Sequence, residues 1–379
     1  MTVAIDSPFS AEELEPTLRP LLEASLLPAR AYTDESVADW ERRNLFLGGW
    51  VCVGHLSAFA DRGAYLTYEL GDEGLLFIGD GEGNVRGFFN VCRHRAARLI
   101  TGAEGSVRRL QCPYHAWSYG FDGTLKNAPH TEELLDFDPA CNSLRAIRTE
   151  VAGGLVFADV SGVAPPLADH VGSLVEQLDL YRNGELRRGA RIDYDVAANW
   201  KAIVENYSEC LHCPGVHPEL NRLSHYLSGD DFEGPGAWCG GSMTLTKEDA
   251  DTMATGGGHA GRPHIDGVDP RVVLYFAIFP NCLVSLHPDY VMLHTIWPDG
   301  PGRTKVVCEW FFEPETMDRE DFDGSDAIDF WDLVNRQDWE VCELSQLGIA
   351  SSGYTPGRYT AVENTVHDFD RMVAEAYLR

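Results

Sequence analysis

Two short fragments of this chain each offer one thiol and one imidazole to a metal. Cys92 and His94 form a C-x-H pair, Cys112 and His115 form a C-x-x-H pair, and 17 residues separate the pairs. Two such mixed pairs suit a [2Fe–2S] cluster in which two cysteines hold one iron and two histidines hold the other. A structural zinc site also accepts two Cys and two His. Zinc fingers usually place Cys with Cys and His with His, so the mixed pairing favours the cluster.

A second set of possible ligands follows about 100 residues later. The segment 201–212 has apolar residues at helical spacing, and Asn206, Glu209 and His212 form a polar row at i, i+3 and i+6. A Pro-Gly step should end this predicted helix, and His217 follows just beyond it. Two imidazoles and one carboxylate, with coordination positions left open, are typical of non-heme Fe(II) oxygenases. The alternative is two surface histidines near a helix end.

The missing carboxylate can be sought by periodicity. Residues 326–347 are predicted to form a long helix whose apolar face includes Trp331 and Val334. Asp338 lies in the middle of that face. A carboxylate on a buried apolar face is costly unless it is paired or bound to a metal. We therefore expect Asp338 to be the third iron ligand, with an ion pair to Arg336 as the alternative.

These motifs resemble those of a known family. Residues 90–95 and 112–117 resemble the Rieske signature, and residues 205–217 resemble the phrase E-N-x-x-E/D-x-x-H-x-x-x-x-H. Together they resemble the large (alpha) subunits of Rieske non-heme iron oxygenases, and the likeness extends over nearly the whole chain. It implies a [2Fe–2S] Rieske cluster, a mononuclear Fe(II) and O₂ as co-substrate.

The resemblance also implies a role for Glu209. In this family the acidic residue at that position bridges a cluster histidine of one subunit to the iron-binding histidine of the next, and Asn206 lies beside it in the catalytic set. Most ring hydroxylases have Asp there, whereas Glu is similar to the choline-, glycine betaine- and carnitine-type monooxygenases. Electron transfer between subunits implies a head-to-tail ring, a homotrimer or a multiple of trimers.

The expected fold class is α+β, with a small all-β Rieske domain inserted ahead of an antiparallel-sheet, helix-grip catalytic domain. We expect an N-terminal helical segment at 1–44 that packs on the catalytic domain, a Rieske domain at 45–160 and a mononuclear iron domain at 161–379. Short strands with Gly-rich turns dominate 45–160. A helix at 167–180, a long irregular stretch at 228–270 and four strands between 272 and 312 are expected in the last domain.

Composition limits the partners and the compartment. Thirty basic and 59 acidic residues give a net charge of −29, which argues against nucleic acid and anionic membranes as partners. No apolar run is long enough to span a membrane and no signal peptide is visible, so a cytoplasmic protein is expected. The eight cysteines outside the cluster, Cys210 and Cys213 among them, are expected to be reduced.

The chain shows no nicotinamide or flavin site of its own. The run from Gly256 to Gly261 matches G-x-G-x-x-G, but Pro263 stands where the following helix should run and no strand precedes the run. We interpret it as a loop. Electrons from NAD(P)H must then arrive through a separate reductase, or through a reductase and a ferredoxin.

Three functions follow from these patterns. The first is a terminal oxygenase that monooxygenates or N-demethylates a small substrate such as a quaternary ammonium compound. The second is an aromatic-ring hydroxylating dioxygenase, and the third is a Rieske electron carrier without oxygenase activity. A quaternary ammonium group is usually held against aromatic faces. The expected pocket aromatics are Tyr207, Tyr226, Trp238, Tyr275, Tyr290 and Trp297.

Overall fold

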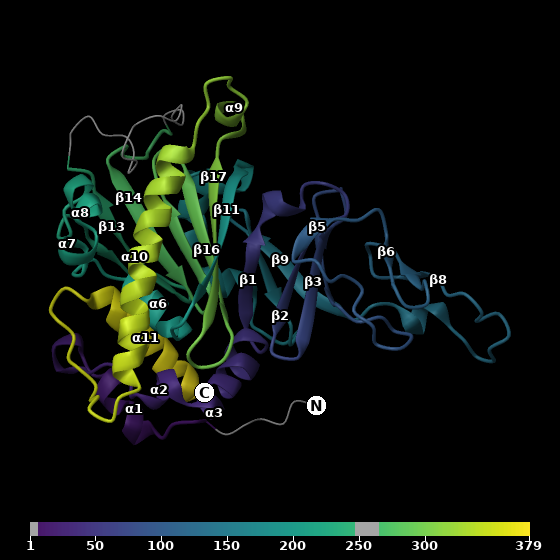
Figure 1. Ribbon diagram of the computed structural model, residues 1–379, viewed down its shortest axis with the longest axis horizontal. Helices are drawn as coiled ribbons and strands as arrows, with labels where there is room; N and C mark the ends of the chain where they lie inside the picture. The colour runs from purple at the N-terminus through teal and green to yellow at the C-terminus, as the bar shows by residue number, and fades with distance from the viewer. Residues whose placement is uncertain (1–6, 247–264) are drawn as a thin grey trace.

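Two antiparallel seven-stranded sheets organise the chain, one in each of two lobes (Figure 1). The computed structural model describes residues 7–246 and 265–379. The expected α+β class, with an all-β lobe ahead of a helix-covered antiparallel sheet, is confirmed. None of the described helices is both long and apolar enough to cross a bilayer.

The first lobe projects from the body and ends in a small three-stranded sheet, β6-β7-β8 (Figure 1). Its large sheet has the order β1-β10-β9-β4-β3-β2-β5. The strands of this lobe are β1 (Trp50–His55), β2 (Ala64–Leu70), β3 (Glu73–Gly79), β4 (Val85–Phe89), β5 (Glu104–Ser106), β6 (Leu110–Gln111), β7 (Ser118–Tyr119), β8 (Leu125–Asn127), β9 (Ala146–Ala152) and β10 (Leu155–Asp159).

The second sheet has the order β11-β17-β16-β15-β14-β13-β12, and the long helix α10 crosses one of its faces (Figure 1). Its central strands are rich in β-branched and aromatic residues and are buried along their length, which suits a covered sheet. The strands are β11 (Arg187–Val196), β12 (Asp231–Phe232), β13 (Trp238–Thr244), β14 (Val272–Ile278), β15 (Cys282–Leu286), β16 (Val291–Pro298) and β17 (Thr304–Phe312).

Helices from both ends of the chain meet below the second sheet. Helix α1 packs on α11, and α2 packs on α10. Helix α10 has Asp338 at its middle and runs as the sequence predicts. The helices are α1 (Ala11–Leu18), α2 (Arg30–Thr33), α3 (Glu35–Glu41), α4 (Leu167–Val171), α5 (Leu174–Leu180), α6 (Trp200–Tyr207), α7 (Cys213–Val216), α8 (Pro218–Leu223), α9 (Pro314–Met317), α10 (Ser325–Ile349) and α11 (Asn364–Tyr377).

Three local predictions were wrong. The helix expected at 167–180 is broken, because Gly172 has a φ of +55° and a Cβ there would lie 1.7 Å from the carbonyl oxygen of Pro235. The helix expected at 201–212 ends at Tyr207. The stretch expected to be irregular contains β13, which pairs with β14 along its whole length. The Gly256 to Gly261 run lies outside the described residues.

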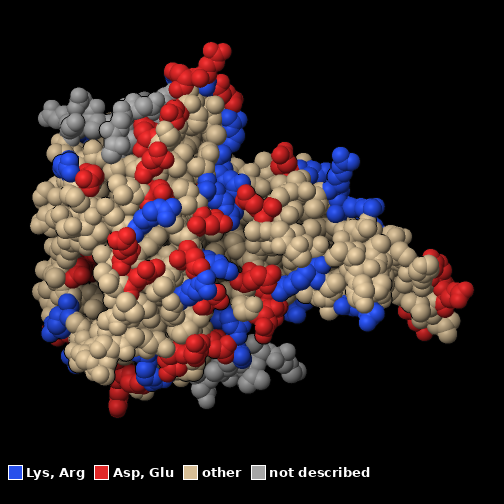
Figure 2. Space-filling view, in the orientation of Figure 1, with Lys and Arg blue, Asp and Glu red and all other residues tan. Residues whose placement is uncertain are grey.

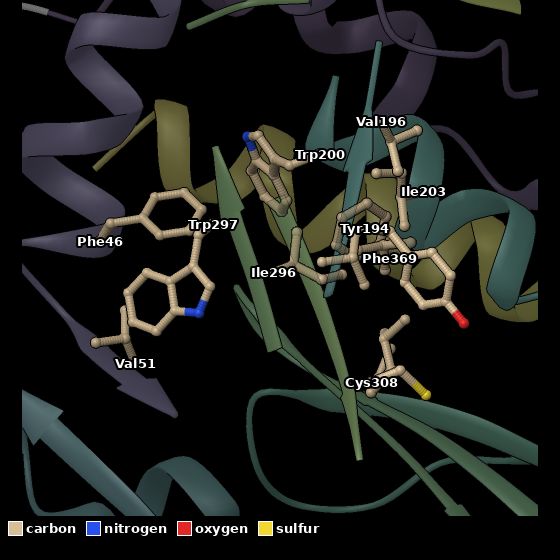
Figure 3. Close-up of a cluster of buried hydrophobic side chains, with 14 of the residues drawn as sticks. Phe46, Val51, Tyr194, Val196, Trp200, Ile203, Ile296, Trp297, Cys308 and Phe369 are labelled. Carbon is tan, nitrogen blue, oxygen red and sulfur yellow. The ribbon is translucent and has the colours of Figure 1, made fainter. Parts of the chain in front are cut away.

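Aromatic and aliphatic side chains from distant segments form the main core (Figure 3). Phe46 packs edge-on against Trp200 at 5.3 Å between ring centroids, and Trp200 in turn meets Phe369 at 5.8 Å. The N-terminal segment, α6 and α11 therefore share one apolar cluster. This cluster positions the start of α6, from which the site described below extends.

Charge is unevenly distributed over the molecule. Acidic side chains are spread over the visible face and gather at the free end of the projecting lobe (Figure 2). Where the lobes meet, Glu104 of β5 pairs with Arg188 at 3.0 Å and with Arg191 at 2.8 Å, both from β11. These ion pairs tie the edge strand of one sheet to the edge strand of the other.

One ion pair is fully buried in the body. Lys201 Nζ lies 2.5 Å from Glu41 Oε1, and the two side chains are 0% and 2% exposed. Trp200 Nε1 donates to the same carboxylate at 2.9 Å, and the Tyr377 hydroxyl also donates to it. The buried Glu41 carboxylate at the end of α3 therefore binds side chains of both α6 and α11 and holds the three helices together.

Lys201→Met should destabilise the protein by about 3–5 kcal/mol, because the Glu41 charge would remain buried without a counter-ion. The exposed pair Arg19–Glu15, with side chains 47% and 57% exposed, supplies a control. Arg19→Met should cost less than about 1 kcal/mol. Urea unfolding followed by tryptophan fluorescence measures both. An effect of Lys201→Met no larger than the control would contradict this account.

Candidate active site

Two loops with the same hydrogen-bond pattern carry the Cys/His pairs. The Cys92 amide donates to the Ala97 carbonyl at 2.9 Å, and the Cys112 amide donates to the Trp117 carbonyl at 2.8 Å. In each loop the residue before the acceptor is an alanine in the left-handed region, with φ of 58° and 61°. Non-glycine residues rarely adopt this conformation. The surrounding loop therefore imposes a tight turn around each pair.

The thiols of the two pairs face the interior, and the imidazoles lie nearer to solvent. Cys92 and Cys112 are each 2% exposed, and burial raises the pKa of the Cys92 thiol. His94 is exposed and His115 is half-buried, and the centroids of their rings lie 4.7 Å apart. Nδ1 of His115 is buried and has no hydrogen-bond partner among the described residues. This donor set fits a [2Fe–2S] cluster with its histidine-bound iron toward solvent.

Sequence reasoning missed the role of Tyr119 in this lobe. Its hydroxyl lies 3.3 Å from Cys92 Sγ and accepts a hydrogen bond from the Arg93 amide at 3.1 Å. Since the amide already donates to the oxygen, the hydroxyl proton is free to point at the sulfur. Hydrogen bonds to ligand sulfurs are one of the features that set the potential of an iron–sulfur cluster.

The structure brings His212, His217 and Asp338 together. The two histidines lie at the two ends of α7, and Asp338 lies in the middle of α10. Their candidate ligand atoms all lie within 4.8 Å of one another. Asp338 Oδ1 is 2.7 Å from His217 Nε2 and 3.3 Å from His212 Nε2. The short helix α7 separates the two histidines along the chain, and Asp338 approaches both of them from α10. Two imidazoles and one carboxylate in this arrangement fit a mononuclear iron with open positions.

The other ring nitrogens of the two histidines are also held. His212 Nδ1 lies 2.5 Å from Glu209 Oε1, and His217 Nδ1 lies 2.7 Å from Gln337 Oε1. Such partners fix the tautomer and leave Nε2 to the metal. When no metal is bound, the Nε2 atoms can instead carry protons toward Asp338. Burial then acts to raise the pKa of Asp338, but hydrogen bonds from both imidazoles outweigh it and lower the pKa.

A turn, not a helix, places Glu209 beside His212. Helix α6 ends at Tyr207, so the two residues do not share one helix face as the periodicity predicted. Instead Glu209 folds back over the turn and accepts from the Leu211 amide. The same turn is closed by a Cys210–Cys213 disulfide, so the expectation that both cysteines are reduced was wrong. The C-x-x-C spacing brings their Cα atoms to 5.0 Å, within disulfide range.

A cavity of about 470 Å³ opens beside the three candidate ligands. Asn206 and the tyrosines Tyr207, Tyr226 and Tyr275 line it, and the Tyr207 and Tyr275 rings meet edge-on at 6.0 Å. Tyr207 donates to or accepts from Ser285 Oγ at 2.9 Å. Half of the aromatics expected in the pocket are therefore in its wall.

The other three expected aromatics lie in the core. Trp297 is 4% exposed and stacks on Tyr68, with 4.1 Å between centroids (Figure 3 shows it among core side chains). Tyr290 is fully buried and accepts from Trp331 Nε1 at 2.7 Å. Trp238 belongs to a separate apolar cluster. Successive side chains of a strand point to opposite faces of the sheet. Trp297 and His294 both lie on β16 and are an odd number of residues apart, so Trp297 points away from the cavity that His294 lines.

Sequence reasoning missed several wall residues. Trp331 was interpreted only as a core position of α10, and Met292, His294 and Ser285 were not singled out at all. The available signal was the spacing on α10, where Trp331, Asn335 and Asp338 follow one another at i, i+4 and i+7. Such residues share one helix face.

The chain matches two family models. Residues 49–142 match the Rieske [2Fe-2S] domain, and residues 184–379 match the ring hydroxylating alpha subunit (catalytic domain). The glycine betaine monooxygenase oxygenase subunit of Chromohalobacter salexigens is 30% identical, over 95% of this chain and 87% of that protein. The chloroplastic choline monooxygenase of Arabidopsis thaliana is 28% identical, over 94% and 84%.

Solved structures share the fold. The quaternary ammonium Rieske monooxygenase CntA aligns over 96% of this chain and 98% of its own, with a TM-score of 0.82 and 24% identity. Naphthalene 1,2-dioxygenase from Rhodococcus sp. aligns over 93% and 94%, with a TM-score of 0.76 and 18% identity. From its two matched domains and its full-length relatives, the chain belongs to the Rieske non-heme iron oxygenases, as the terminal oxygenase (alpha) subunit.

Proposed function

We propose that this oxygenase acts as a monooxygenase on a small quaternary ammonium substrate. The observation that carries the proposal is the cavity beside His212, His217 and Asp338, whose wall includes three tyrosines and Trp331. A cation without an N–H is held best by aromatic faces. No Lys or Arg occurs among the described residues that line the cavity, whereas Asp230 and Asp231 do.

The named relatives support the same substrate class. The proteins at 30% and 28% identity are named for glycine betaine and choline, and a carnitine monooxygenase oxygenase subunit of Escherichia coli is 34% identical over 55% of this chain and 58% of its own length. All three substrates carry a trimethylammonium group. The naphthalene dioxygenase shares the fold alone, so an aromatic substrate is the competing class.

We further propose that Cys92, His94, Cys112 and His115 hold the Rieske cluster, and that His212, His217 and Asp338 hold the mononuclear iron. The bound cluster supplies single electrons, and the bound iron supplies the site of O₂ chemistry. Glu209 and Gln337 fix the imidazoles, and the Asn206-lined wall holds the substrate against the open side of the ligand set.

We propose a head-to-tail trimer in which Glu209 links His212 to a cluster histidine of the neighbouring subunit. Glu209 already contacts His212 on one side, and the imidazoles of the cluster lobe lie toward solvent, where another subunit can reach them. Electrons come from a separate reductase. We place the enzyme in the cytoplasm, because eight of its ten cysteines form no disulfide.

The iron assignment is tested by Asp338→Ala. The variant should keep the visible spectrum of the cluster, while its iron content falls from three toward two per chain and turnover is lost. Asp329→Ala, at an exposed position of the same helix, is the matched control and should keep all three irons. Metal analysis beside the absorption spectrum measures both. Full iron content in Asp338→Ala would place the third ligand elsewhere.

The electron-transfer role is tested by Glu209→Gln, which removes the charge but keeps an oxygen that can accept from His212. Both metal sites should remain loaded, and oxidation of the reduced cluster should slow roughly 10–100-fold, as is typical when a group behind a ligand is changed. Glu219→Gln on α8 is the control. Stopped-flow single turnover gives the rates. Equal rates in the two variants would reduce Glu209 to a structural group.

The substrate class is tested with choline and its neutral isostere 3,3-dimethylbutan-1-ol, which has a tert-butyl group in place of trimethylammonium. Choline should bind roughly tenfold tighter or more, the value of a desolvated cation–π contact. Calorimetry on the oxidised holoenzyme gives the affinities, and O₂ uptake with formaldehyde detection reports turnover. Equal or reversed affinities would favour a neutral or aromatic substrate.

A further inference from the structure

His294 is a polar side chain in the cavity wall that the chemistry so far does not use. It lies on β16, is 2% exposed and lines the cavity. Its Nδ1 is buried and has no hydrogen-bond partner among the residues that the structure describes. A buried polar atom without a partner is costly, and it usually signals a ligand or water that completes the site.

A chain of hydrogen bonds decides which proton state this nitrogen has. The Tyr194 hydroxyl donates to Asp332 Oδ1 at 2.7 Å, so its oxygen is left to accept. The Tyr194 oxygen accepts a hydrogen bond from Asn335 Nδ2 at 3.4 Å. The amide nitrogen of Asn335 therefore points to Tyr194, and its oxygen, Oδ1, points to His294. Asn335 Oδ1 lies 3.3 Å from His294 Nε2 and can only accept, so Nε2 carries the proton.

Nδ1 of His294 is consequently a lone-pair acceptor on a side chain that lines the cavity. Burial lowers the pKa of His294 to about 4, so the ring is neutral at pH 7 and Nδ1 carries no second proton. Asp332 also pairs with Arg336 at 3.0 Å, so an ion pair anchors the far end of this chain of hydrogen bonds.

His294 lies close to the reacting region. Its partner Asn335 is three residues before Asp338 on α10, and residues at this spacing share one helix face. The ring also meets the cavity-lining Tyr207 at 6.2 Å between centroids. On β14, which is separated from β16 by β15, the buried Tyr275 hydroxyl likewise has no partner among the described residues.

A lone-pair acceptor discriminates between the two polar ends found among trimethylammonium compounds. A hydroxyl can donate a hydrogen bond to Nδ1, whereas a carboxylate offers only lone pairs and is repelled by it. A buried carboxylate also needs a positive partner. The described wall contains no Lys or Arg, and Asp230 and Asp231 add negative charge.

We propose that His294 is a specificity-determining residue whose Nδ1 accepts a hydrogen bond from the substrate, so that the enzyme selects a hydroxylated quaternary ammonium cation over a carboxylated one. This inference rests on the proposed function, since it assumes the cation. Asn335 and Tyr194 are positioning residues that hold the acceptor tautomer.

The test compares three ligands with choline by calorimetry on the oxidised holoenzyme. Ethyltrimethylammonium lacks the hydroxyl, glycine betaine has a carboxylate in its place, and 3,3-dimethylbutan-1-ol lacks the charge. Choline should bind roughly fivefold tighter than ethyltrimethylammonium, the value of one hydrogen bond, and at least about tenfold tighter than glycine betaine.

Variants locate the effect. In His294→Leu the preference for choline over ethyltrimethylammonium should fall to within about twofold, while the preference over 3,3-dimethylbutan-1-ol remains. Tyr194→Phe removes only the outer acceptor of the chain and leaves the cavity wall intact. It should lower the ratio of choline to glycine betaine affinity several-fold. Tyr68→Phe is the matched control and should keep both ratios, because the Tyr68 hydroxyl donates to the Val53 carbonyl at 2.8 Å and Tyr68 is not among the described residues that line the cavity.

The outcomes separate the two proposals. Equal binding of choline and 3,3-dimethylbutan-1-ol would overturn the cationic substrate. Tighter binding of glycine betaine, or equal binding of ethyltrimethylammonium with a retained cation preference, would overturn the role of His294 alone. If His294→Leu does not fold, the wild-type series and Tyr194→Phe still decide the question, because unchanged ratios in Tyr194→Phe would exclude the positioning chain.

Discussion

The half-buried carboxylate of Asp338 is the constraint on which the catalytic lobe depends. A carboxylate in the middle of an apolar helix face costs several kcal/mol unless positive or proton-donating groups surround it. Here the Nε2 atoms of His212 and His217 lie 3.3 and 2.7 Å from the carboxylate, and the three side chains form a candidate site for a positively charged metal. To bring the two histidines there, the chain must leave α6 at Tyr207 and turn sharply into α7. The buried Glu41–Lys201 pair and the Trp200 core contacts hold the start of that segment.

Helix α10 connects the candidate metal site with the wall of the cavity. Over two turns it presents Trp331 to the cavity wall, Asn335 to His294 and Asp338 to the two histidines. Because these residues share one face, a shift of the helix would move all three together. If the proposed assignments hold, one helix governs both the metal ligands and the selectivity, while β14 to β16 contribute rings and hydroxyls to the cavity wall.

The projecting lobe and the body differ in how far their candidate ligands are exposed to solvent. The two loops of the projecting lobe bury their cysteines and leave their histidines near solvent, so the donor set is half inside the protein and half at its surface. Tyr119 lies beside the buried sulfur of Cys92, where a hydrogen bond changes the electronic properties of a bound cluster most directly. The body, in contrast, encloses its ligand set beside a cavity. Surface access suits electron exchange with another protein, and enclosure suits oxygen chemistry.

The sequence by itself was enough for the family, the α+β class, helix α10 and the two sets of candidate ligands, because short motifs and helical periodicity encode them locally. The C-terminal end of α6 could not be predicted, since the turn at Glu209 is stabilised by contacts with α10, which lies over 100 residues away. The Cys210–Cys213 pairing was missed because cysteine spacing was judged by compartment and not by the geometry of the turn. The cavity wall needed the tertiary structure most. Strand register and sheet stacking decide which aromatic rings face the cavity, so Tyr275 lines it and Trp297 does not. Only the folded structure aligns Tyr194, Asn335 and His294, which come from three separate elements, into one hydrogen-bonded chain.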